Sequence, residues 1–133
     1  MKTWYPSSKV QKMISRTPGT IRGYFPAQLL ADATFKIAGP IASFFGMTGI
    51  TFRKDCIVLS EEFCSSGNPG WQSAVIFHEL VHVAQQKNMG MLAFKSIYVW
   101  EWIKSGFSYQ KMKRIGLEKE AYDTEAAFVM GAR

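Results

Sequence analysis

The chain has 133 residues, of which 47% are apolar and 14% aromatic, and its formal net charge is +6. This length and composition predict one globular domain with a sufficient hydrophobic core, and they exclude a disordered or low-complexity chain. The longest apolar stretch, residues 37–50, is too short to span a bilayer, so no transmembrane segment is expected. The N-terminus also lacks the apolar core of a secretory signal. We therefore expect a cytoplasmic protein, unless a non-classical route exports it.

The N-terminal part of the chain gives few periodic signals. Residues 1–25 contain several proline and glycine breakers, so we expect an N-terminal arm or loop that packs on the domain. Pro26 then predicts the start of a helix that runs to about Ala38, where a Gly-Pro pair stops it. Residues 41–45 can add one more helical turn.

A β-hairpin is predicted next. Two short β-prone runs, residues 50–52 and 56–59, are separated by three charged residues. Cys56 is the first residue of the second run, and Cys64 follows that run. Without a secretory signal they are expected to be reduced thiols, although their placement around the strand also permits a disulfide bond.

A long helix is predicted after the loop of residues 65–70. Asn68 provides an N-cap, and Pro69 occupies the first helical position, where proline is well tolerated. Gly90 ends the helix. Between these signals the helix is apolar on almost every side, which is typical of a central buried helix.

Three polar residues interrupt this apolar helix, namely His78, Glu79 and His82. Histidines four apart lie on one face of a helix, so both imidazoles can bind a single ion, and Glu79 can reach a water on that ion. The chain has no other histidine. This His-Glu-x-x-His pattern predicts a zinc site with a general base. The alternative is a polar pair in a core helix, bonded to backbone and water.

Two further helices are predicted downstream. Residues 91–104 are rich in aromatic side chains, which core packing explains, and residues 117–130 begin with acidic side chains, as the helix macrodipole prefers. The elements together predict an α+β fold that is mainly α. We expect four or so helices around the central helix, with a short β-hairpin or a small antiparallel sheet.

Basic and aromatic residues gather between these two helices. The cluster consists of Lys104, Lys111, Lys113 and Arg114 near Trp100, Trp102, Phe107 and Tyr109. We favour a solvated loop after an amphipathic core helix. The alternative is a surface for nucleic acid or an anionic membrane, but no nucleic-acid module signature accompanies the charge, so no specific nucleic-acid binding is expected.

The third ligand of the predicted metal site is not a histidine. A catalytic zinc usually has three protein ligands and one position for water, so a carboxylate or a thiolate must complete the set. The last helix offers Glu118, Glu120, Asp123 and Glu125. Cys64 is the upstream thiol, as in peptide deformylases, but the neighbouring deformylase motifs are absent and a lone cysteine is more often a small core residue.

Two segments together resemble the gluzincin-type zinc metallopeptidases, and most closely the small bacterial HExxH domains associated with extracellular contractile injection systems. Residues 78–86 read HELVHVAQQ, and residues 118–122 read EKEAY. In that family a short β segment precedes the motif helix and a helix bearing Glu-x-x-Ala follows it. The resemblance covers about residues 25–130, and it implies that residues 1–133 form a single zincin-like metallopeptidase domain.

The resemblance also implies a ligand set. Glu118 would bind Zn2+ beside the two histidines, and Ala121 would let the two helices approach. The family often has Asp four residues after the ligand Glu, where it orients a histidine, whereas this chain has Tyr122 there and Asp123 one residue later. This departure keeps Glu120 as an alternative ligand. We expect Asp123 and Glu125 to be solvated or to support a ligand by a contact from outside the ligand set.

The implied activity is the hydrolysis of a peptide or protein substrate, with Glu79 as the general base. The oxyanion needs a second electrophile, for which we select Tyr122, with Tyr109 and Arg114 as alternatives. The hairpin can bind extended substrate or only cover the core. The alternative function is a metal-binding adaptor or processing domain of a secretion or toxin system without peptidase activity, which would have a secretion-system partner.

Overall fold

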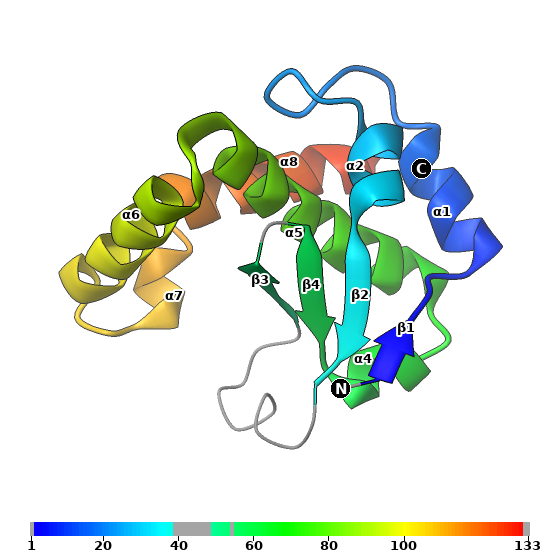
Figure 1. The fold of residues 1–133 in the computed structure, drawn as a ribbon, viewed down its shortest axis with the longest axis horizontal. Helices are drawn as coiled ribbons and strands as arrows, with labels where there is room; N and C mark the ends of the chain where they lie inside the picture. The colour runs from blue at the N-terminus through cyan, green and yellow to red at the C-terminus, as the bar shows by residue number, and fades with distance from the viewer. Residues whose placement is uncertain (1, 39–48, 54, 132–133) are drawn as a thin grey trace.

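The computed structural model describes residues 2–38, 49–53 and 55–131 (Figure 1). The fold is α+β and mainly α, as the sequence predicts. The elements in chain order are β1 (Lys2–Trp4), α1 (Ser8–Ser15), α2 (Pro26–Asp32), β2 (Thr34–Ile37), β3 (Gly49–Arg53), β4 (Cys56–Leu59), α4 (Glu61–Ser65), α5 (Pro69–Met89), α6 (Met91–Lys104), α7 (Tyr109–Met112) and α8 (Gly116–Gly131).

Helix α5 is the element on which the others pack. It contacts α8, α1, α6, α2 and strand β3. The start and end signals act as predicted, because the Asn68 side chain accepts a hydrogen bond from the Trp71 N–H, Pro69 opens the helix, and Gly90 ends it with a φ of +87°. Most of its residues are buried, as expected for a helix that is apolar on almost every side.

The sheet has four strands in the order β1-β2-β4-β3. Strands β3 and β4 pair antiparallel, which confirms the predicted hairpin. Strand β2 pairs parallel with β4, with Phe35 opposite Ile57, and antiparallel with β1. The sheet is therefore mixed and not antiparallel as expected. Figure 1 shows α5 crossing behind it.

The helix predicted from Pro26 to Ala38 is wrong in its second half. Helix α2 ends at Asp32, and the next residues form strand β2 between two partner strands. The sequence of β2, TFKI, is β-prone, and pairing on both sides with a buried Phe35 outweighs the helical pattern. The additional turn predicted for residues 41–45 lies outside the described residues.

The expectation of an arm or loop over residues 1–25 is also wrong in part. Strand β1 extends the sheet, and α1 buries Val10 and Ile14 completely against the core. The Ser7 side chain caps α1 by accepting from the Val10 N–H. A serine cap followed by apolar residues four apart is a helix signal that the breakers nearby obscure.

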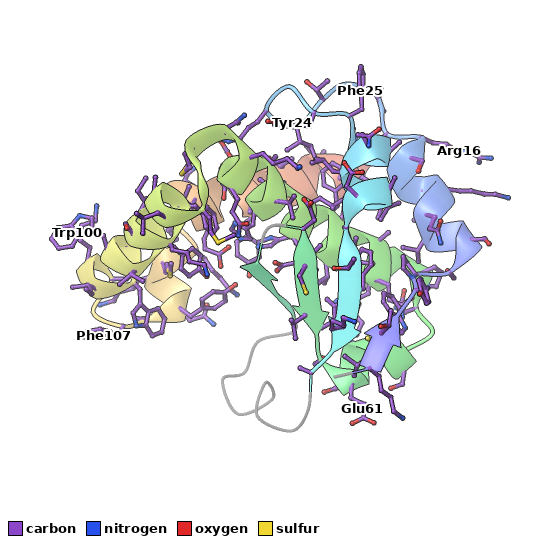
Figure 2. The ribbon with its side chains drawn as sticks, viewed as in Figure 1. Arg16, Tyr24, Phe25, Glu61, Trp100 and Phe107 are labelled. Carbon is purple, nitrogen blue, oxygen red and sulfur yellow. The ribbon has the colours of Figure 1, made fainter. Side chains whose placement is uncertain are left out.

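Helices α6 and α8 match the predicted residues within one position. Core packing explains only part of the aromatic content of α6, because Phe94 is buried while Trp100 is exposed (Figure 2). Among the residues that the structure describes, no helix has the length and apolarity needed to cross a membrane.

The contact between α5 and α8 can be tested at its aromatic pair. The rings of Phe77 and Phe128 stack with centroids 4.4 Å apart, and both side chains are buried. We expect Phe128→Ala to lower the free energy of unfolding by about 3 kcal/mol, because it removes a buried aromatic ring. Urea denaturation measures this loss. The control Phe25→Ala removes a ring that is 66% exposed, and an equal loss there would contradict the assignment.

Candidate metal centre

Two helices bring three side chains together at one point. His78 and His82 lie one turn apart on α5, and both direct their Nε2 atoms at the same oxygen of Glu118 on α8. The distances to Glu118 Oε1 are 3.1 Å from His78 and 2.5 Å from His82. All three side chains are buried. One ligand atom from each lies within 4.8 Å of the others, so the three can hold one metal ion.

The donor set fits a divalent transition metal. Two imidazole nitrogens and one carboxylate oxygen leave a fourth tetrahedral position for water. Metal–ligand bonds of about 2.0–2.1 Å place tetrahedral donors about 3.3 Å apart, which is close to the 3.1 Å between His78 and Glu118. The 2.5 Å between His82 Nε2 and Glu118 Oε1 has to lengthen by less than about 1 Å to reach this separation of tetrahedral donors. The same donors suit zinc without selecting it alone.

The electrostatics of the three groups are coupled. Burial lowers the pKa of His78, but the hydrogen bond to Glu118, the nearby Glu125 carboxylate and the charge of Glu79 outweigh it and raise that pKa to about 10. The pKa of His82 is raised in the same way by Glu118 and Glu79. Burial disfavours the charged form of Glu118, yet the two histidines hold its pKa well below its usual range. A cation at this point is therefore favourable.

A chain of hydrogen bonds orients His82. The Gln85 amide NH2 donates to Leu117 O at 3.1 Å and to Glu120 Oε1 at 2.8 Å, so its oxygen faces His82. This oxygen accepts from His82 Nδ1 at 2.8 Å, which leaves Nε2 as the metal-binding nitrogen. Arg22 continues the chain through an ion pair with Glu120 at 2.6 Å.

A different carboxylate faces His78. Its Nδ1 lies 3.2 Å from Glu125 Oε1, an ion-pair distance without the alignment of a hydrogen bond. Glu125 thus lies where it can orient the His78 ring. The ring of Tyr122 packs edge-on against the His78 ring, with centroids 4.3 Å apart, and limits its rotation.

The position of Glu118 is fixed from α6. Its second oxygen, Oε2, accepts from the Tyr98 hydroxyl at 3.3 Å. The buried Glu101 carboxylate accepts from the Leu117 N–H at 3.0 Å, so it caps the first turn of α8 beside Glu118. Gly116 permits this approach, because a Cβ there would lie 1.4 Å from Glu101 Oε2, and its φ is +48°.

Other residues predicted for the site have different positions. Glu79 is buried on α5 next to His78. The hydroxyls of Tyr122 and Tyr109 are 2.8 Å apart, and Lys113 Nζ lies 5.2 and 5.1 Å from the centroids of their rings. Arg114 is exposed. Glu120, the alternative ligand, pairs with Arg22 instead of facing both histidines.

The thiolate alternative finds no support in the geometry. Cys64 lies on α4, where it packs against the hydrophobic core, and burial raises the pKa of its thiol to about 11. Cys56, which would bond with Cys64 if a disulfide formed, is also a free thiol. The reduced state predicted for both residues therefore agrees with the structure.

Sequence reasoning gave no role at this centre to Gln85, Tyr98 or Arg22, and it placed Glu125 outside the ligand set as a solvated or supporting carboxylate. Gln85 carried a signal, because a residue three after His82 shares its helix face. The structure shows Glu125 facing His78. Nothing local connects Tyr98 or Arg22 with the histidines, since 20 and 98 residues separate them from their partners Glu118 and Glu120.

The assignment of the third ligand predicts different effects for two neighbouring glutamates. We expect Glu118→Ala to abolish stoichiometric binding of zinc, because the buried carboxylate is one of three donors. We expect Glu120→Ala to retain one ion per chain with affinity lowered about 10- to 100-fold, because it acts through Gln85 and His82. Elemental analysis and a competition titration measure both effects. The reverse order of the two variants would move the ligand to Glu120.

The coupled groups also predict a pH dependence in the presence of a chelator. The folded-state pKa of His78 is raised to about 10, so its stabilising contribution is complete below the unfolded value of about 6.5 and is lost as the pH rises through 10. The free energy of unfolding should fall by up to about 1.4 kcal/mol per pH unit in this window. Urea denaturation from pH 6 to pH 10 measures the slope. His78→Gln should flatten it, and an equally steep fall in that variant would contradict the prediction.

Comparison of the chain with protein-family models, with curated protein sequences and with solved structures finds no match. The case for a metal centre therefore rests on the sequence motif and on the convergence of His78, His82 and Glu118.

Proposed function

We propose that the chain is a zinc-dependent peptidase of the gluzincin type. The observation that carries this proposal is the convergence of both histidine Nε2 atoms on one oxygen of Glu118, with Glu79 buried beside them. A structural polar pair in the core would not need a carboxylate from a second helix directed at both rings.

The residues divide the chemistry between them. His78, His82 and Glu118 would hold the zinc ion, which would supply a Lewis acid that activates water. Glu79 accepts a proton from the attacking water and then passes it to the leaving amine. Gln85 and Glu125 keep the two imidazoles oriented throughout.

A tyrosine hydroxyl supports the oxyanion in this proposal. Burial raises the pKa values of Tyr109 and Tyr122, so both stay protonated and able to donate at neutral pH. Tyr122 also contacts the His78 ring, which places it nearer to the metal ligands than the exposed Arg114. We therefore retain Tyr122 as the donor, with Tyr109 as the group that holds its hydroxyl at 2.8 Å.

Strand β3 is where we propose that extended substrate binds. It is the last strand of the sheet and contacts α5, which carries the histidines. An edge strand has backbone donors and acceptors that can pair with a peptide. The hairpin thus has a use beyond covering the core.

The peptidase proposal is tested with zinc-loaded protein and unfolded casein, with and without chelator. We expect chelator-sensitive cleavage by the wild type. Glu79→Gln should keep one zinc per chain and lose activity about 10²- to 10⁴-fold, because only the proton transfer is removed. Tyr122→Phe should lower kcat with unchanged zinc affinity.

Two outcomes would overturn this mechanism. Full activity of Glu79→Gln with zinc bound would exclude Glu79 as the general base. A wild type that binds zinc tightly but cleaves neither casein nor itself would favour the alternative, a metal-binding adaptor or processing domain of a secretion or toxin system.

A further inference from the structure

One face of helix α6 is apolar and exposed. Leu92 is 82% exposed, Trp100 57% and Val99 55%, and Phe107 just beyond the helix is 63% exposed. Figure 2 shows Trp100 and Phe107 at the outer edge of the molecule, directed away from its body. Large apolar patches on a folded protein usually mark an interaction surface. The proposed peptidase chemistry does not use this face.

The apolar side chains of α6 are arranged as a stripe. Leu92, Val99 and Ile103 are spaced by seven and four residues, so they lie along one line of the helix, with Trp100 beside it. Lys95 and Lys104 fall on opposite flanks of this stripe at 100° per residue. Both lysines are exposed. An apolar stripe with a cation on each flank is typical of a helix that lies in a membrane interface.

The charge around this stripe has one sign. Residues 91–116 contain five basic residues, Lys95, Lys104, Lys111, Lys113 and Arg114, and one acidic residue, Glu101. Glu101 is buried and caps the first turn of α8, so it does not contribute to the outer surface. Lys104 on α6 and Lys111 on α7 are exposed, whereas Lys113 lies over the rings of Tyr109 and Tyr122. The segment that carries the stripe is therefore basic on its outer surface.

We propose that the outer face of α6, together with Phe107, docks on the surface of an anionic lipid membrane. Trp100 and the aliphatic side chains would enter the interfacial region, and the lysines would pair with anionic headgroups. The ring of Trp100 already lies 5.9 Å from Lys104 Nζ, an amphipathic pair suited to this boundary.

Three other occupants fit the face less well. A second copy of the chain would bring like charges together around the stripe. Nucleic acid would leave the aliphatic stripe of Leu92, Val99 and Ile103 without a partner. An apolar groove of a partner protein would have to carry carboxylates on both rims to match the lysines that flank the stripe.

The proposal has a geometric consequence for the metal centre. Tyr98 lies on the inner side of α6 and donates to Glu118, while Leu92, Val99 and Ile103 lie on the outer side. Docking would therefore hold the metal ligands one helix diameter from the lipid surface. Membrane docking does not depend on peptidase activity. Either property can be shown or excluded without the other.

The test is flotation of the full chain with vesicles of phosphatidylcholine alone or of phosphatidylcholine with phosphatidylglycerol. We expect binding to the anionic vesicles that weakens with added salt, and at least tenfold weaker binding to the neutral ones. Val99→Gln with Trp100→Gln should reduce binding to anionic vesicles by tenfold or more. The matched control, Tyr5→Gln with Phe25→Gln, changes two residues that are 79% and 66% exposed on other elements.

Two double charge-reversal variants distinguish the effect of the local surface of α6 from the effect of the net charge of the chain. Lys104→Glu with Lys111→Glu should abolish the preference for anionic vesicles, whereas Lys9→Glu with Lys12→Glu on α1 changes the net charge equally and should leave most of it. Figure 1 shows α1 and α6 at opposite ends of the molecule. All four lysines are exposed, so each variant can fold, and thermal unfolding checks that it does.

Several results would overturn the proposal. The first is that the chain does not bind anionic vesicles, and the second is that it binds neutral and anionic vesicles equally. The third is that the α6 variants and their controls lose equal amounts of vesicle binding. A concentration-dependent dimer in sedimentation that the Val99→Gln, Trp100→Gln variant abolishes would assign the face to a second copy instead.

Discussion

The contact of one carboxylate with two imidazoles is the constraint on which the rest of the structure depends. Glu118 is buried, and a buried charge is costly unless partners surround it. The packing of α8 against α5 supplies those partners, with Ala121 fully buried at the interface and Phe77 stacked on Phe128. The fold therefore holds a charged cluster within the apolar interface between α5 and α8.

The residues around this cluster come from every side of α5. Arg22 in the loop before α2 acts through Glu120 and Gln85, and its φ of +52° is an uncommon conformation for a residue with a side chain. Asn88 on α5 pairs with Arg22 through both its amide oxygen and its NH2 group. Loss of such a second contact typically lowers the affinity of a metal site by about 10- to 100-fold.

Helix α6 has two unlike sides. On its inner side, Tyr98 donates to Glu118 of the candidate metal centre and Glu101 caps the first turn of α8. Its outer side carries the apolar stripe and the lysines, which the core does not need. The aromatic residues of α6 lie on both sides of the helix. Core packing therefore explains the buried Phe94 but not the exposed Trp100.

Local signals determined much of this protein. The Asn68 cap, Pro69 and Gly90 define α5, and four-residue spacing places the histidines on one face, because both effects act within a few residues. The β3–β4 hairpin and α8 are local in the same sense. The sequence and its family resemblance also named Glu118 as the third ligand.

Only the tertiary structure decided the remaining points. Residues 34–37 become a strand because β1 and β4 pair with them on both sides, and no local pattern encodes that pairing. The direction of Glu118 toward both histidines, and of Glu120 toward Arg22, depends on how α8 is rotated against α5. That rotation is set by packing between elements far apart in the chain, so residue spacing alone cannot supply it.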